Sequence, residues 1–264
     1  MVKLLITGVC GKMGSAILKL AVSDKDFQIT GAVERKGHPM VGQPADRIVG
    51  GAPDNVTIVD DVSRVIDACD VIIDFTDPPA TLENFRFVRE KQKCIVIGTT
   101  GFSGDAIGQI RDSRDVRVVI SPNMSIGMNL MFDVIDRVSK VLQDGYDIEI
   151  VEMHHRWKKD APSGTAMKLK DIVKDAQTGK QWEEIYGRKG ITGERKNGEI
   201  AILGLRGGDI VGEHTVMYAG IGERLEITHR AYSRENFARG ALTAAKWIVR
   251  QGPGIYGMKD VLGL

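Results

Sequence analysis

The chain of 264 residues carries nearly balanced charge, with 36 Lys and Arg residues against 35 Asp and Glu residues. This length allows two modest hydrophobic cores or one large one, and the balance gives no reason to expect nucleic acid as a partner. The cysteines Cys10, Cys69 and Cys94 are odd in number and lack CxxC spacing, which indicates buried, reduced thiols. Because no apolar run is long enough for a signal peptide or a membrane span, we expect a cytoplasmic protein with no membrane association.

The amino-terminal segment has the order strand, glycine turn, helix, strand and acidic residue. An apolar strand over 2–7 leads into the G-x-x-G-x-x-G turn of residues 8–14, a helix over 15–21 and a second strand over 27–33 that ends at Glu34. Such glycines let the backbone approach a pyrophosphate, and an acid about 20 residues further on can bind ribose hydroxyls. The usual spacing is G-x-G-x-x-G, and glycine turns also occur as plain helix connections. The flanking strands and the terminal acid nevertheless favour dinucleotide binding.

The alternation of strands and helices continues to about residue 123. Apolar strands are predicted over 70–76, 93–98 and 116–120, with a helix over 79–91. This pattern is typical of a parallel sheet covered on both faces, and ligands of such sheets bind at the carboxyl ends of the strands. The small and polar residues of 75–76, 98–101 and 121–124 therefore lie along one expected crevice, where a cofactor could bind.

The pattern changes after residue 123. A long amphipathic helix is predicted over 125–143, followed by strands over 146–153, 199–205, 212–219 and 224–229. A final helix over 234–250, capped by Ser233 and stopped by Gly252–Gly254, carries a small apolar stripe typical of core packing, and we expect it to return to the first domain. The prediction is an α/β protein with a Rossmann-like dinucleotide-binding domain (1–124 and 234–264) and an α+β domain (125–233) with an open mixed sheet.

The segment 154–166 concentrates titratable side chains before a small-residue turn that opens a helix. If the pleat of the preceding strand continues, His154, Arg156 and Lys158 share one face, and His155 and Trp157 share the other. Ser163 or Thr165 can cap the helix that follows, and its first amides can bind a carboxylate or phosphate. A single histidine is more often structural than catalytic, but clustered titratable groups favour a site that moves protons on an anionic substrate.

A metal site at the adjacent histidines is a competing interpretation. Neighbouring strand residues point to opposite faces, and no further His or Cys stands at ligand spacing. We therefore expect no metal.

Five segments occur together and in order: Gly8–Gly14, Glu34–Arg35, Gly98–Gly101, Ser121–Ser125 and His154–Ala166. With Val211–Val216 and Glu223–His229, they closely resemble the 4-hydroxy-tetrahydrodipicolinate reductase (dihydrodipicolinate reductase) family, which acts in bacterial diaminopimelate and lysine biosynthesis. The resemblance covers nearly the whole chain, and the segment beginning at His154 is its most specific part.

The resemblance implies a role for each matching residue. His154 matches the catalytic acid/base and Lys158 a second proton donor, whereas His155, Gly164 and Thr165 match residues that hold the carboxylates of a small dicarboxylate substrate, and Ser163 belongs to the same turn. The residues that match cofactor contacts are Gly8, Val9, Cys10, Gly11, Lys12, Met13, Glu34, Arg35, Gly98, Thr99, Thr100, Ser121, Pro122, Asn123 and Met124. Cys10 stands where some relatives have glycine. The family also implies a homotetramer, assembled through the sheet of the second domain.

The residues themselves suggest use of both NADH and NADPH. Glu34 can accept hydrogen bonds from a ribose 2′-hydroxyl, whereas Arg35 and Lys36 can meet the 2′-phosphate of NADPH. Two other functions fit the first half of the chain. One is a different nicotinamide-dependent dehydrogenase acting on another amino or keto acid, and the other is a dinucleotide-sensing regulator. Neither gives the segment 154–166 a specific purpose.

Overall fold

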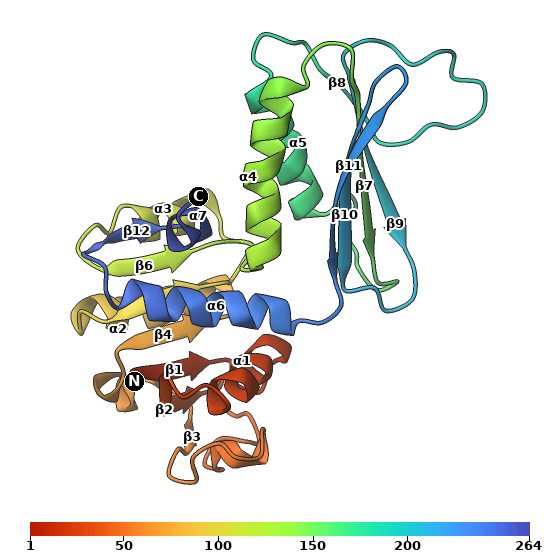
Figure 1. Cartoon of the computed structure of the whole chain (residues 1–264). Coiled ribbons are helices and arrows are strands. Elements are labelled where there is room, and N and C mark those ends of the chain that lie inside the picture. The colour runs from red at the N-terminus through yellow and green to blue at the C-terminus, as the bar shows by residue number, and fades with distance from the viewer. The chain divides into compact units, whose positions relative to one another are not determined.

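The computed structural model describes all 264 residues and divides them into two compact units. Unit 1 consists of Met1–Ile126 and Arg234–Leu264, and unit 2 consists of Gly127–Ser233. Each unit has its own sheet and its own hydrophobic core (Figure 1). No helix is long and apolar enough to cross a membrane.

Unit 1 is built on a seven-stranded sheet in the order β12-β6-β5-β4-β1-β2-β3, and every neighbouring pair is parallel. The carboxyl ends of its strands therefore meet along one edge. The strands are β1 (Val2–Thr7), β2 (Phe27–Val33), β3 (Ile58–Val59), β4 (Val71–Asp74), β5 (Cys94–Ile97), β6 (Arg117–Ile120) and β12 (Gly254–Tyr256).

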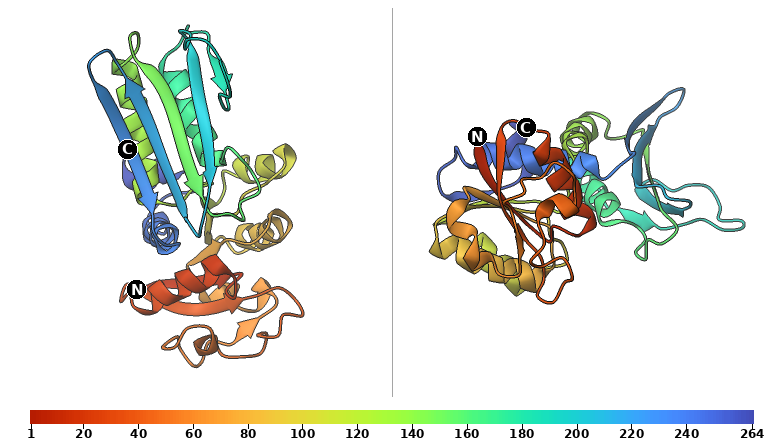
Figure 2. Two further views of the ribbon diagram at one scale, coloured as in Figure 1. Left: turned by 90° about the vertical axis from the view of Figure 1, so that its right-hand side faces the viewer. Right: turned by 90° about the horizontal axis from the view of Figure 1, so that it is seen from below.

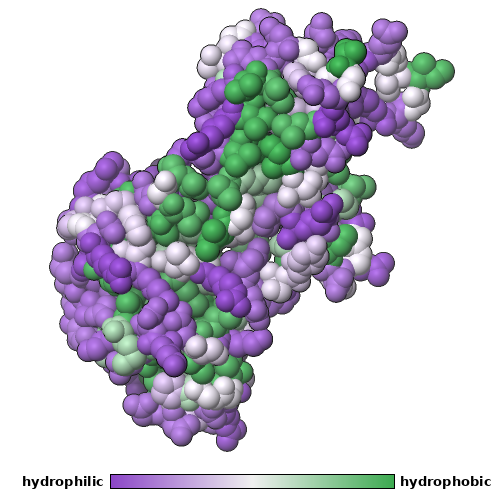
Figure 3. All heavy atoms as spheres, in the orientation of Figure 1, coloured by the Kyte–Doolittle hydropathy of each residue, from purple (hydrophilic) through white to green (hydrophobic).

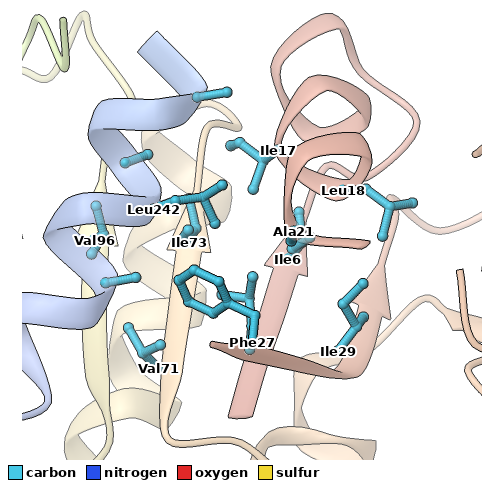
Figure 4. Close-up of a cluster of buried hydrophobic side chains, with 14 of the residues drawn as sticks. Ile6, Ile17, Leu18, Ala21, Phe27, Ile29, Val71, Ile73, Val96 and Leu242 are labelled. Carbon is cyan, nitrogen blue, oxygen red and sulfur yellow. The ribbon is translucent and has the colours of Figure 1, made fainter. Parts of the chain in front are cut away.

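Helices cover both faces of this sheet because successive strand residues point to opposite faces, and the residues on both faces are apolar. On one face Leu4 and Ile6 pack with α1 (Lys12–Val22), α6 (Glu235–Ile248) and α7 (Met258–Leu262). Figure 4 shows part of this cluster, with Ile6 beside Ile17 of α1 and Leu242 of α6. On the other face Leu5 packs with α2 (Pro78–Glu90) and α3 (Gly104–Arg111). Three short 3₁₀ helices, Ala45–Arg47, Val62–Arg64 and Ile66–Ala68, complete the unit.

Unit 2 is a five-stranded mixed sheet in the order β11-β10-β7-β9-β8, with antiparallel β11-β10-β7 and parallel β7-β9-β8. Its strands are β7 (Asp147–His154), β8 (Glu183–Ile185), β9 (Glu199–Arg206), β10 (Gly212–Ala219) and β11 (Arg224–Ala231). The helices α4 (Ile126–Val141) and α5 (Gly164–Ala176) pack on one face, and Figure 2 shows that the other face is bare. Apolar side chains also gather over α4, where Leu130 and Val141 are exposed (Figure 3).

The predicted fold class is confirmed: a parallel Rossmann-like sheet is joined to a unit with a mixed sheet. The last long helix packs in unit 1, as expected. Arg234, at the position before this helix, already has helical backbone angles and makes no side-chain capping hydrogen bond. Cys10 is only partly buried, whereas Cys69 and Cys94 are buried free thiols.

Several short elements were not foreseen. The tail beyond Gly252 forms β12 and α7, and the small elements β3, β8 and α3 were also missed. β12 has three residues and pairs with β6, a strand far away in the sequence, so its existence depends on tertiary pairing.

Candidate active site

The glycine turn of unit 1 holds the start of α1 close against the end of β1. The Val9 N–H donates to Val33 O at 3.1 Å, and the Gly11 N–H donates to Gly8 O at 2.9 Å. A Cβ at Gly14 would lie 2.1 Å from Gly8 O and 2.7 Å from the Val9 Cα. Gly14 is therefore required for close packing of the helix on the turn, and Gly8 for its positive φ of +60°.

Glu34, at the end of β2, turns its carboxylate toward the glycine turn. It accepts a hydrogen bond from the Cys10 N–H at 3.0 Å and another from the Arg35 N–H at 2.9 Å. Burial, reinforced by the Glu34 charge, raises the pKa of the Cys10 thiol to about 11. The thiol is therefore neutral near pH 7, and no negative charge is added next to the acid.

A cavity of about 760 Å³ opens at this edge of the sheet. Its walls include Gly8, Cys10 and Gly11 of the turn, Glu34 and the basic pair that follows it, and residues at the start of α2. A volume of this size matches sites for small molecules and cofactors. An acid beside two bases, next to a helix start, provides groups that fit the ribose and phosphates of a dinucleotide.

A buried carboxylate that the sequence reasoning did not single out supports one wall of this cavity. Asp74, fully buried at the end of β4, accepts hydrogen bonds from the Thr76 N–H, from the hydroxyls of Thr76, Thr81 and Thr99, and from the Asn84 amide, at 2.6–3.1 Å. Thr76 and Asn84 line the cavity. Asp74 thus joins the loop after β4, the first turns of α2 and the loop after β5. The signal in the sequence was an acid at the end of an otherwise apolar strand.

The predicted cofactor residues divide into two groups. Gly8, Cys10, Gly11, Glu34 and Arg35 line the cavity, whereas the other ten do not. Among those ten, the side chains of Val9 and Met124 lie in the core, Thr99 and Ser121 are buried in hydrogen bonds to neighbouring residues, and Lys12, Thr100 and Pro122 are exposed. Met13, Gly98 and Asn123 are partly exposed. Gly98–Thr100 and Ser121–Met124 follow β5 and β6, along the same carboxyl edge.

Unit 2 carries a polar cluster at the end of the helix-covered face of β7. Ile148 and Ile150 point into the core from this face, and Glu152 follows at the next position with the same parity. Strand pairing places Arg206 of β9 opposite His154, and His214 of β10 opposite Glu152. The sequence reasoning had missed Glu152, Arg206 and His214 as site residues. The signal in the sequence was the polar pair Glu152 and His154, at positions of β7 that have the same parity as the core residues.

The Glu152 carboxylate is fully buried and makes hydrogen bonds through both oxygens. It lies 2.6 Å from His154 Nδ1, and Arg206 donates to it twice, at 2.8 and 2.9 Å. The Ser163 N–H donates to Oε1 at 3.0 Å. Burial would raise the pKa of this carboxyl, but the hydrogen bonds from Arg206 and His154 outweigh burial and hold the pKa below its usual range.

His154 is oriented by this carboxylate. With Nδ1 facing Glu152, the ring places Nε2 above Gly212, where an added Cβ would lie only 3.0 Å from that nitrogen. Burial lowers the pKa of His154, and the Glu152 carboxylate opposes this shift. A neutral imidazole whose Nδ1–H bonds to a carboxylate exchanges protons at Nε2, which is the arrangement of a general acid/base.

A second imidazole, His214, lies against His154. The two rings meet edge to face, with centroids 5.2 Å apart, and His214 Nε2 is 3.1 Å from Ser163 Oγ. Burial lowers the pKa of His214 to about 3. His214 is therefore neutral near pH 7 and adds no charge beside His154.

The predicted anion-binding turn begins α5. Ser163 is its N-cap, and its Oγ accepts from the Ala166 N–H at 3.2 Å, so the serine of the predicted Ser/Thr alternative is the cap. The Ser163 side chain is buried in this role, whereas Gly164 is exposed and a Cβ there would meet no atom within 4 Å. The first N–H groups of a helix have no acceptor within the helix, which suits this end to binding an anion.

The pleat of β7 does not continue beyond His154, so the condition for placing Arg156 and Lys158 on the same strand face as His154 is not met. The strand ends at His154, and the chain turns, with the Arg156 N–H donating to Gly208 O and the Lys158 N–H donating to His155 O, each at 3.1 Å. The turn arises because the backbone pairs here with a loop rather than with a strand. Lys158 Nζ binds both carboxylate oxygens of Asp160 at 2.9 Å. The ring of His155 lies 5.8 Å from that of Trp157, which is mostly exposed.

No group of three His, Cys, Asp or Glu side chains is placed to hold a metal ion.

Two family models match the chain. "Dihydrodipicolinate reductase, N-terminus" matches residues 2–124, and "Dihydrodipicolinate reductase, C-terminus" matches residues 127–262. The chain is similar to the 4-hydroxy-tetrahydrodipicolinate reductases of Syntrophus aciditrophicus (49% identity, 100% of this chain and 99% of the relative) and Geotalea uraniireducens (47% identity, 100% of both).

Among solved structures, the fold is similar to that of a dipicolinate-bound dihydrodipicolinate reductase from Paenisporosarcina sp. TG-14. The TM-score is 0.78 at 22% identity, over 99% of this chain and 100% of the other. At this identity the likeness concerns the fold.

Proposed function

The chain belongs to the dihydrodipicolinate reductase family, and from this premise we propose that it reduces 4-hydroxy-tetrahydrodipicolinate to tetrahydrodipicolinate in lysine and diaminopimelate biosynthesis. The observation that carries this function is similarity over the whole chain, at 49% identity, to a reductase of that name. The enzyme is an oxidoreductase, and NADH or NADPH supplies the hydride.

We propose that residues 1–124 and 234–264 bind the dinucleotide and that residues 125–233 bind the substrate and form the oligomer. The two compact units, with their boundaries at Ile126 and Ser233, support this division. The cavity of unit 1 fits the cofactor, with Glu34 at the ribose and Arg35 and Lys36 near a 2′-phosphate. We propose that the other ten residues that match cofactor contacts of the family also belong to the dinucleotide site: Val9, Lys12, Met13, Gly98, Thr99, Thr100, Ser121, Pro122, Asn123 and Met124.

The polar cluster of unit 2 supports a proton-transfer role. Reduction of a conjugated cyclic imine that carries two carboxylates leaves a carbon that must be protonated. We propose that His154 delivers this proton from Nε2, and that Lys158 is the second donor. The first amides of α5, at Gly164 and Thr165, would take one carboxylate, with His155 beside them.

We further propose a homotetramer assembled through the sheet of unit 2, in the cytoplasm. The bare face of this sheet supports the proposal, because the registers of β7, β9 and β10 place Val151, Met153, Leu203, Leu205 and Met217 on it. Leu205 is half exposed in the single chain. Light scattering at working concentration should report a mass about four times 28.9 kDa, and a monomer would contradict the proposal.

The reductase activity can be tested with a coupled assay. Dihydrodipicolinate synthase generates the substrate, and the absorbance of the reduced nicotinamide is followed. We expect absorbance to fall only when both this protein and the substrate are present. Saturable NADH binding with no turnover would instead favour a dinucleotide sensor. Turnover of other amino or keto acids alone would favour a different dehydrogenase.

A further inference from the structure

One buried carboxylate joins the proposed proton donor to the proposed anion-binding turn. Glu152 Oε2 faces His154 Nδ1 at 2.6 Å, and Oε1 accepts from the Ser163 N–H at 3.0 Å, one residue before α5. Arg206 bridges both oxygens from the neighbouring strand and also donates to Asp160 O at 2.5 Å. A carboxylate with no exposed surface is stable only when it is paired and fully hydrogen-bonded, and Glu152 meets both conditions.

We propose that Glu152 is a positioning residue for the reduction. It holds the His154 ring with Nδ1–H toward the carboxylate, so that the protonated imidazolium delivers its Nε2 proton to the substrate carbon and becomes the neutral Nδ1–H tautomer. The inference rests on the proposed role of His154. The same carboxylate fixes the backbone at Ser163, so the donor and the start of α5 keep a constant relative position. Arg206 is the counter-ion that allows the carboxylate to be buried.

The charges around His154 predict the direction in which its pKa should shift when each charge is removed. The negative charge of Glu152 on β7 favours the protonated imidazole. The positive charges of Lys158, in the turn after β7, and of Arg206, on β9, disfavour it. His214 of β10 touches the ring but is neutral near pH 7. Removing the Glu152 charge should therefore lower the pKa of His154, and removing the Arg206 charge should raise it.

A purely structural Glu152 would behave differently. It would hold β7, β9 and the start of α5 together. Its loss would lower stability and activity, but the pH limbs of kcat would not shift in opposite directions in the two charge variants. The tautomer of His154 would also stay the same when Glu152 is replaced. The pH profile and the tautomer therefore separate positioning from structural support.

The principal variant is Glu152→Gln, because the amide oxygen can still accept from the Ser163 N–H while the charge is lost. The matched control is Asp136→Asn, on α4 of the same unit, where the carboxylate pairs with Lys140 at 2.6 Å. The companion variant is Arg206→Met, which removes the opposite charge. Steady-state kinetics over pH 5–9 and NADH titration are measured for all three and for the wild type.

For Glu152→Gln we expect kcat to fall about 10²-fold or more, the effect of a wrongly held imidazole, while KM changes by no more than about threefold. The basic limb of kcat against pH should move to lower pH in this variant and to higher pH in Arg206→Met. Asp136→Asn should match the wild type. Unchanged NADH affinity checks the fold of unit 1, and unchanged thermal unfolding by circular dichroism checks that unit 2 has folded as well.

A second measurement does not depend on turnover. The chain has only five histidines, so ¹⁵N spectra of histidine-labelled protein are simple, and His154→Gln assigns the resonance of interest. We expect the Nδ1–H tautomer for His154 in the wild type, and a mixed or reversed tautomer in Glu152→Gln.

The inference would be overturned by a Glu152→Gln enzyme with wild-type kcat, or by pH limbs that move the same way in both charge variants, or by an unchanged tautomer. Failure of the proposed role of His154 is distinguishable, because it would show as wild-type turnover in His154→Gln. Failure of the proposed reductase activity would show as absent turnover in the wild type. If Arg206→Met does not fold, the tautomer of Glu152→Gln still decides.

Discussion

Replacing Asp74 by alanine tests whether one buried carboxylate holds the wall of the cofactor cavity in place. Five donors surround it, and all come from the loops after β4 and β5 and from α2. Hydrogen bonds to a charged group are each worth about 1.5–3 kcal/mol, so a simple sum would exceed roughly 7 kcal/mol. That sum is too large, because Thr81 Oγ1 also lies 2.9 Å from Thr99 Oγ1 and 3.2 Å from Thr76 Oγ1.

The hydroxyls can therefore bond to one another once the carboxylate is gone. We expect Asp74→Ala to lower the free energy of unfolding by about 3–5 kcal/mol, the usual cost of breaking a buried charged network. Asp74→Asn should cost less, about 1–2 kcal/mol, because its oxygen still accepts from the threonines and the Asn84 amide can flip to accept from the new NH₂ group. With roughly 2–4 °C per kcal/mol, the alanine variant should melt about 6–20 °C below the wild type.

The assay is thermal unfolding by circular dichroism, with NADH affinity measured in parallel. Asp67→Ala is the control, since Asp67 is exposed and its carboxylate pairs only with Lys91. Because Thr76 and Asn84 line the cavity, NADH should bind more weakly to Asp74→Ala than to the control. An Asp74→Ala protein that melts within about 2 °C of Asp67→Ala would show that the network does not support the fold.

Three further predictions concern turnover and cofactor choice. His154→Gln and Lys158→Ala should each cut kcat by about 10²–10⁴-fold with NADH affinity nearly unchanged, and Lys158→Ala should also raise the substrate KM; near wild-type turnover in steady-state kinetics would contradict these roles. Thr165→Val should mainly raise the substrate KM, since it alters anion binding and leaves the donor intact, and an unchanged KM would argue against this contact. Neutralising Arg35 and Lys36 together should weaken NADPH far more than NADH in fluorescence titrations, so equal losses would remove the assignment.

The sequence alone determined the features that are local in the chain. The order of strand, glycine turn, helix, strand and Glu34 depends on neighbouring residues and their periodicity, and the structure has these elements where they were expected. The segment from His154 to Thr165 could be singled out for the same reason, because its titratable groups and its helix cap are contiguous.

Only the tertiary structure decided which side chains meet. Periodicity indicates the face on which Glu152 lies, but the partners of Glu152 come from β9 and from the start of α5, and strand order and register cannot be read from one strand. The Asp74 network is equally non-local, because its donors follow two different strands. The strand ends at His154 because a strand continues only while a neighbouring strand pairs with it. Beyond this residue the chain bonds to the loop at Gly208 instead.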